Sequence, residues 1–244
     1  MYNTYIYQPI LSSLLWLYQI TGHNLGFAII LLTLVIRGIL IPFTLPQLKS
    51  AKKMALLKPE LDALKKKHGH DAKLFQQKQL EFHKTHQVNP AAGCLPFIAQ
   101  FIVLIALYRV FMDTLGANGM ADINTSFLFW DLKAKDTTYI LPVLAGVLQF
   151  IMSLTILPAV ENEPEKRPGT KEQKADVAEM ATSMQQQMVF MMPIMTIIFS
   201  IQFPSGLALY WVITTAFSLV QQLIVSGPGA LLFYARKYKL LKRK

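Results

Sequence analysis

Long apolar runs divide this sequence, and they constrain its fold more than any other feature. Five runs are long enough, or nearly so, to cross about 30 Å of hydrocarbon as helices. With their flanks, the predicted spans cover residues 25–46, 93–112, 138–158, 188–203 and 206–226. Charged residues make up only 16% of the chain, whereas about 25% is usual in soluble domains. We therefore expect an all-α integral membrane protein with five transmembrane helices.

Basic residues between the runs predict the orientation. Lys and Arg number 10 in residues 49–84, 2 in 113–136, 4 in 161–179 and 6 in 236–244. Because cytoplasmic segments carry the excess of Lys and Arg, the N-terminus is expected outside and the C-terminus in the cytoplasm. The predicted cytoplasmic segments are 47–92, 159–187 and a basic tail at 227–244, and the outer loop is 113–137. Anionic lipid headgroups or RNA are candidate partners for the net charge of +10.

The segment before the first span, residues 1–24, contains apolar residues at helical spacing: Ile10, Leu14, Leu17 and Tyr18. It is too short to cross a bilayer, so we expect an amphipathic helix on the outer interface. A flexible leader is the alternative. The first span lacks a basic n-region before it and a small-residue cleavage site after it, so we expect a mature span and not a signal peptide.

Residues 47–92 are rich in Lys and Gln and predict a basic cytoplasmic hairpin of two helices. Pro59 fits the first position of one helix, Gly69 its end, and Asp71 the N-cap of the next. Four histidines occur here, His68, His70, His83 and His86. A metal site is conceivable, but the spacing lacks a paired H-x-x-x-H, and solvated polar positions are the better interpretation.

One arginine, Arg37, lies thirteenth in the 21-residue apolar run 25–45. A charge near the centre of a bilayer costs about 2.5–3.5 kcal/mol on insertion scales, so such a residue usually faces a bundle interior or water. All 14 Asp and Glu residues fall between the predicted spans. Arg37 is therefore predicted to have no carboxylate partner inside the membrane.

Polar residues at helical spacing mark faces on three predicted spans. The fifth span carries Trp211, Thr215, Ser218 and Gln222, and the third carries Pro142, Gly146, Gln149 and Ser153. In the first span, Thr33 lies one turn from Arg37. Such residues often only hold helices together. Three polar faces and an arginine without a carboxylate favour a shared wet cavity over that alternative.

Residue types that carry chemistry are missing from the spans. His, Asp and Glu do not occur well inside them, and the single cysteine, Cys94, lies near an edge. The chain has neither a Walker A loop nor H-E-x-x-H. We therefore expect a protein that is not an enzyme and has neither a cofactor nor a metal. An anion channel that uses Arg37 for selectivity and a structural assembly factor are two functions that this pattern leaves open.

Several stretches resemble the YidC-type membrane protein insertases. They are the Arg37-centred first span, "KMALLKPEL" (53–61), "VNPAAGCLPFIAQ" (88–100) and "FPSGLALYWVITTAFSLVQQ" (203–222). They occur in order at the spacing of that family, and the resemblance covers nearly the whole chain. The resemblance is to the compact five-span type, and we expect neither the large outer domain nor the preceding signal anchor of some members.

The resemblance implies a bacterial plasma-membrane insertase and chaperone with a hydrophilic groove centred on Arg37. It implies that Gln149 and Trp211 line this groove, and Thr33, Thr215 and Ser218 are added from the polar faces. The expected partners are nascent membrane proteins, with the ribosome, a Sec-type translocon and anionic lipids as further candidates. DNA is not expected as a partner, and a monomer is the expected functional unit. For the tail at 236–244, lipid anchoring is favoured over ribosome docking.

Overall fold

The computed structural model describes residues 3–88, 95–115, 123–156 and 177–228. These residues are mostly helical, which confirms the all-α prediction. In chain order the elements are η1 (Asn3–Tyr7), α1 (Gln8–Ile20), α2 (Leu25–His68), α3 (Ala72–Thr85), α4 (Leu95–Leu115), β1 (Ser126–Phe127), β2 (Trp130–Asp131), α5 (Ile140–Ile156), α6 (Val177–Gln202) and α7 (Ser205–Ser226). The predicted cytoplasmic loop at 159–187 and the tail at 227–244 lie largely outside the described residues.

Two helical stretches among the described residues are long and apolar enough to cross a membrane, Leu25–Leu57 and Ser205–Ser226. Two shorter apolar helices, Ile140–Thr155 and Phe190–Gln202, fall on the third and fourth predicted spans. Helix α4 falls on the second predicted span. This architecture agrees with an all-α membrane protein, and the number of five spans stays a prediction.

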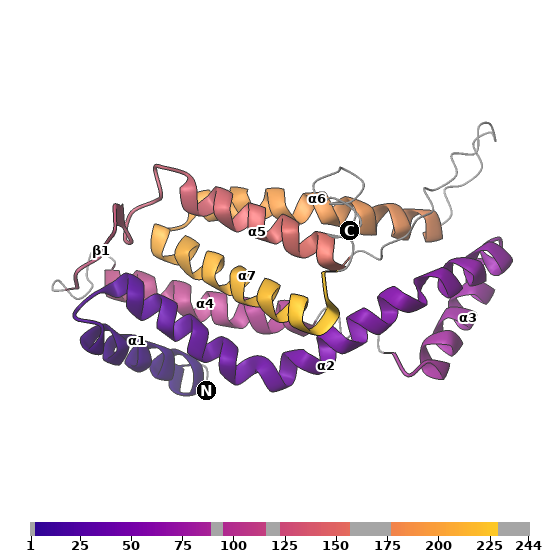
Figure 1. Cartoon of the computed structure of the whole chain (residues 1–244), viewed down its shortest axis with the longest axis horizontal. Coiled ribbons are helices and arrows are strands. Elements are labelled where there is room, and N and C mark those ends of the chain that lie inside the picture. The colour runs from indigo at the N-terminus through magenta and orange to yellow at the C-terminus, as the bar shows by residue number, and fades with distance from the viewer. Residues whose placement is uncertain (1–2, 89–94, 116–122, 157–176, 229–244) are drawn as a thin grey trace, which may run out of the picture.

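The helices pack as an elongated bundle with α7 near its centre (Figure 1). Helices α5 and α6 lie side by side, and α7 packs between α5 and α2. Helix α1 packs against α2, and α4 contacts both α1 and α7. The first half of α7 is almost entirely buried, which places this helix where α2, α4 and α5 can share its surface.

Close contacts at two glycines explain how tightly these helices pack. A Cβ on Gly206 of α7 would lie 2.5 Å from the Phe111 ring of α4. A Cβ on Gly146 of α5 would lie 2.3 Å from Ile197 of α6. Small residues allow such close approach between membrane helices. Gly146 therefore allows α5 and α6 to pack closely. Helix packing is the alternative to a wet cavity that the sequence left open for this polar face.

Helix α2 differs most from the sequence prediction. It continues for 44 residues and contains Pro42, Pro46 and Pro59, so the prediction that Pro59 begins a separate helix is wrong. Each proline removes one hydrogen bond from the helix, but the chain on both sides keeps helical geometry, as neighbouring helices often allow in membrane proteins. The residues around Arg37 and the following basic segment therefore belong to one continuous helix.

The turn between α2 and α3 follows the sequence prediction. Gly69 ends α2, and its N–H donates to the Lys65 carbonyl at 2.7 Å. Asp71 caps α3, because its Oδ1 accepts from the N–H groups of Lys73 and Leu74 at 3.0 and 3.1 Å. Helix α3 then packs back against α2.

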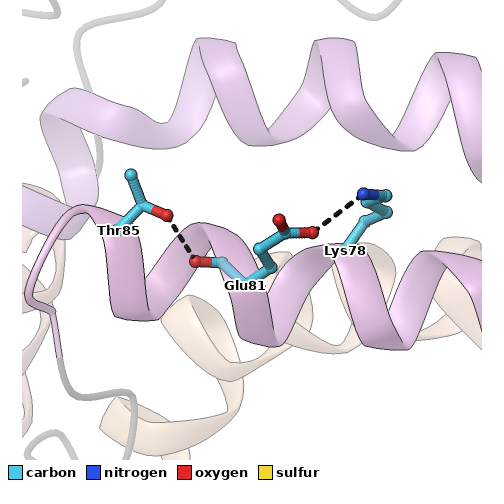
Figure 2. Close-up of polar contacts among 3 residues, drawn as sticks. All are labelled: Lys78, Glu81 and Thr85. Atoms are coloured by element: carbon cyan, nitrogen blue, oxygen red, sulfur yellow. Dashed lines mark hydrogen bonds and ion pairs between the residues drawn. The ribbon is translucent and has the colours of Figure 1, made fainter.

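The solvent-facing side of α3 carries its own local contacts (Figure 2). Lys78 Nζ lies 2.8 Å from Glu81 Oε2, and the hydroxyl of Thr85 donates to the Glu81 carbonyl at 2.9 Å. The hydrogen bond and the charge of Lys78 lower the pKa of Glu81. Both side chains of the ion pair are exposed, so this contact contributes little to stability.

The histidines of this region do not form a metal site within the described part of the chain. No group of three or more His, Cys, Asp or Glu residues there could hold a metal ion. His70 is exposed, and His86 Nε2 lies 3.6 Å from Glu60 Oε2. His83 is instead buried, which lowers its pKa, so the prediction of a solvated position is wrong for this residue.

Asp136 organises the segment before α5. Its Oδ1 accepts from the backbone N–H and hydroxyl of Thr138 at 2.8 and 2.5 Å and from Trp130 Nε1 at 3.1 Å. Its Oδ2 accepts from the N–H of Leu141 at 2.8 Å. Burial disfavours the carboxylate, but these hydrogen bonds outweigh burial and lower the pKa of Asp136.

Replacement of Asp136 by asparagine should therefore destabilise the end of the bundle where α5 begins. We expect the free energy of unfolding to fall by about 1–3 kcal/mol, the cost of leaving buried donors unpaired. This loss should appear as a lower Tm in detergent. Because the folded pKa is depressed, the contribution of Asp136 is complete above its unfolded pKa of about 3.9 and falls as pH drops through the folded pKa. The Tm of the parent should therefore exceed that of the variant near neutral pH, and this difference should disappear only in acid.

The matched control is Asp131→Asn, since Asp131 is exposed and its Oδ1 accepts only from the N–H of Lys133, at 3.0 Å, among the described residues. This control should keep the parental Tm within about a degree. Equal Tm values for Asp136→Asn and the parent near neutral pH would contradict the proposed role of Asp136.

Candidate functional site: a cavity beside Arg37

One face of α2 forms a wall of a cavity in the bundle. This face carries Thr33, Arg37, Leu40, Thr44 and Gln47. Their spacings of 4, 3, 4 and 3 residues place them on one side of the helix. The cavity has a volume of about 50 Å³, several times the roughly 10–15 Å³ that a water molecule needs. Its lining consists of Thr33, Ile36, Arg37, Leu40, Phe43, Thr44, Gln47, Gln100, Val103 and Tyr210. Helices α2, α4 and α7 therefore build the cavity together.

Arg37 has a neutral hydrogen-bond partner in this cavity. Its Nη2 donates to Oε1 of Gln100 on α4. Gln100 Nε2 in turn donates to the Tyr210 hydroxyl of α7 at 2.9 Å. The partner of Arg37 is a neutral amide, and no carboxylate is among the described residues that line the cavity. The relay connects three helices and leaves the positive charge without a counter-ion among the lining residues.

The guanidinium of Arg37 keeps further hydrogen-bonding capacity. It has five N–H donors, and the bond to Gln100 is the only one found within the described ranges. Arg37 is partly buried, so its remaining donors face a space with limited water. An acceptor that enters the cavity can therefore bind Arg37 more strongly than it would in bulk water.

The structure brings only some of the predicted site residues together. Thr33 is buried and lines the cavity with Arg37, while its hydroxyl donates to the Ile29 carbonyl at 2.6 Å. Gln149, Trp211, Thr215 and Ser218 are absent from the lining given above. The prediction of a shared groove stays untested for these four residues.

Two of the four residues bond within their own helix. The hydroxyl of Thr215 donates to the Trp211 carbonyl, and that of Ser218 donates to the Thr214 carbonyl, both at 2.9 Å. Such backbone bonds satisfy a hydroxyl without any neighbouring helix. Hydrogen bonds within α7 therefore account for the polar residues spaced along it. This spacing did not indicate that Tyr210 is the α7 residue that lines the cavity with Arg37.

Sequence reasoning missed four polar residues of the cavity: Thr44, Gln47, Gln100 and Tyr210. Two signals could have found some of them. Gln100 is the only amide side chain in the apolar run 93–112, and Thr44 and Gln47 continue the spacing of Thr33 and Arg37. Tyr210 carried no such signal, because tyrosine is common in apolar helices near interfaces.

Two contacts join α2 to the end of α7, one of them at Thr44 of the cavity lining. Gln221 Nε2 donates to Thr44 Oγ1 at 2.7 Å. Lys52 Nζ donates to the Val225 carbonyl at 3.1 Å, one of the carbonyls left unpaired at a helix C-terminus. These contacts fix the basic part of α2 against α7.

Large apolar side chains cover the outside of the helices. Examples with exposed fractions above half are Ile39, Phe43, Phe101, Phe190 and Ile224. Soluble monomers rarely expose apolar surface on this scale. A helix bundle that is apolar outside and polar around Arg37 suits a lipid environment.

Comparisons with known proteins also point to a membrane protein. Residues 16–229 match the family described as 60Kd inner membrane protein. The chain is 34% identical over 231 residues to the membrane protein insertase MisCA of Bacillus subtilis, covering 93% of this chain and 80% of that protein. It is 35% identical over 230 residues to the membrane protein insertase YidC of Fusobacterium nucleatum, covering 93% of this chain and 100% of that protein. The chain belongs to the 60Kd inner membrane protein family, the family of the YidC-type proteins.

Proposed function

We propose that this protein is a membrane protein insertase that receives short hydrophilic segments in the cavity beside Arg37. The observation that carries the proposal is a positive side chain inside an apolar bundle, held by a neutral amide and not by a carboxylate. Relatives of similar length carry the name membrane protein insertase. Together these facts favour a transient partner for Arg37 that comes from another chain.

In this mechanism, an acidic or polar segment of a substrate replaces Gln100 as the acceptor for Arg37. Charge-assisted hydrogen bonds are about twice as strong as neutral ones, so a carboxylate competes well against the amide of Gln100. The bond offsets part of the cost of bringing the segment into the bilayer. Transfer of the following apolar segment into lipid then completes insertion without nucleotide hydrolysis.

The groove proposed from the sequence extends beyond the described cavity. In this proposal Gln149, Trp211, Thr215 and Ser218 contact the substrate together with Thr33 and Arg37. Gln149 and Trp211 are both partly exposed, and their helices α5 and α7 pack against each other. These two side chains are therefore open to a passing segment, which supports their inclusion.

Five spans with the N-terminus outside are part of the proposal, and labelling tests them. Single cysteines near Lys66 and Lys171 should be shielded from an impermeant reagent in intact cells, because both lie in basic segments predicted to be cytoplasmic. A cysteine near Asn124 should react. The background variant lacks Cys94, and permeabilised cells provide the control for reactivity. Labelling in the opposite sense would refute this topology.

The proposed partners are nascent membrane proteins, met by a monomer in the bacterial plasma membrane. The six basic residues in 236–244 are proposed to contact anionic lipids at about 1 kcal/mol per residue near the surface. Ribosomal RNA and a Sec-type translocon are further proposed contacts. The lipid contact is favoured because the tail is short and follows directly on an apolar stretch, residues 231–234.

The decisive experiment uses the purified protein in liposomes with a newly synthesised single-span substrate. Photo-crosslinkers at Trp211 and Gln149 should capture the substrate, and its tail should become protected from protease. Crosslinkers at Ile39 and Ile224, which are exposed on the bundle surface, are the matched controls for chance contact. Anion conductance without insertion would favour a channel, and an absence of both would favour an assembly factor.

A further inference from the structure

The strongest observation outside the Arg37 relay is an amide oxygen without a partner. Gln47 Oε1 is buried and accepts no hydrogen bond from any part of the chain that the structure describes. Most buried polar atoms are paired, so each exception requires an explanation. Gln47 lines the same cavity as Arg37. A donor that enters this cavity can therefore complete the hydrogen bonding of Gln47.

The position of Gln47 relative to Arg37 suggests the shape of that donor. Ten residues separate them on one face of α2, which corresponds to about 15 Å at 1.5 Å per residue. An extended chain covers this distance in about four or five residues at roughly 3.3 Å each. One extended segment could thus contact Gln47 near the basic part of α2 and Arg37 further along the cavity.

We propose that Gln47 is a binding site for the main chain of the translocating segment, accepting a hydrogen bond from a peptide N–H while the segment is extended. The proposal rests on the proposed insertase function and adds the chemical group that is recognised. It assigns Gln47 to the backbone of the substrate and leaves side-chain charge to Arg37.

The chemistry of the lining favours a peptide group over a particular side chain. Gln47 offers an acceptor. Gln100 is a neutral amide with both donor and acceptor groups, and its oxygen is freed when a substrate replaces it at Arg37. A peptide bond has the same two groups, and every residue except proline supplies the N–H. An extended segment leaving water must pair these groups with the protein. Recognition through the main chain would accept segments of many sequences.

The first test measures the shape of the bound segment by disulfide crosslinking. A stalled substrate carries one cysteine at successive positions, and the protein, lacking Cys94, carries either Gln47→Cys or Thr33→Cys. Thr33 and Gln47 lie 14 residues apart, about 21 Å along the helix. The two crosslinking maxima should differ by about six substrate residues for an extended segment. A difference of about 14 residues would indicate a helical segment and overturn the proposal.

The second test removes one peptide N–H from the substrate. In vitro translation can place an α-hydroxy acid at the position that crosslinks to residue 47, which replaces the N–H by oxygen and keeps the side chain. Insertion by the parent should fall about threefold to tenfold, the effect of one neutral hydrogen bond. Gln47→Leu should insert both substrates equally. Gln47→Glu keeps an acceptor and should keep the difference.

Gln221→Leu is the matched control, because Gln221 bonds to Thr44 and is not part of the cavity lining. This variant should show the same N–H dependence as the parent. If the parent and Gln47→Leu lose equal activity with the hydroxy acid, the main-chain site is refuted while insertase activity stands. If the parent inserts neither substrate, the proposed function itself fails.

Discussion

Arg37→Ala should reduce insertion of substrates with acidic translocated tails by roughly tenfold to a hundredfold. The variant loses the donors that would bind a carboxylate in the cavity, and hydrogen bonds to charged groups contribute about 1.5–3 kcal/mol. The measurement is the fraction of substrate tail protected from protease in liposomes. Because the alanine also removes a charge that is costly in the membrane, the variant should fold at least as well as the parent.

Arg37→Lys is the matched variant, since it keeps the charge but loses the planar set of donors. It should retain part of the activity toward acidic tails. Substrates with neutral tails should depend less on Arg37 than substrates with acidic tails. Parental insertion of acidic tails by Arg37→Ala would rule out the proposed role, and equal losses for both tails would show that charge is not what Arg37 recognises.

Local features of the fold could be predicted from the sequence because they depend on neighbouring residues. The end of α2 at Gly69 and the cap at Asp71 use side chains and backbone groups within one turn. The continuity of α2 through Pro59 could not be predicted in this way. A proline disfavours a helix interior locally, whereas α2 also packs against α7 and α3, contacts that a local pattern does not reveal.

The site could be predicted only in part for a related reason. Periodicity identifies which residues share a face of one helix, as for Thr33 and Arg37, but not which helix covers that face. The partner of Arg37 is Gln100, 63 residues away, and it is neutral, so a search for carboxylates missed it. Gly146 shows the converse, because its face was predicted to be polar but packs closely against Ile197.

Gln100→Glu should block insertion about as strongly as Arg37→Ala, although it keeps the size of the side chain and the positive charge of Arg37. The carboxylate would hold the guanidinium in a charge-assisted bond in a partly buried place, where such pairs are stronger than in water. The Tyr210 hydroxyl, which now accepts from Gln100 Nε2, can rotate to donate to the new carboxylate. The relay would therefore persist, with Arg37 no longer available to a substrate.

Three measurements separate this effect from a general defect. The Tm of Gln100→Glu in detergent should equal or exceed that of the parent, because an acceptor is kept and strengthened. Gln221→Glu, which places the same change on a glutamine bonded to Thr44, should insert acidic tails as the parent does. Gln100→Leu should retain more activity than Gln100→Glu, since it leaves Arg37 free. Parental activity in a folded Gln100→Glu variant would show that Arg37 need not be released for insertion. The mechanism in which a substrate replaces Gln100 as the acceptor for Arg37 would then be ruled out.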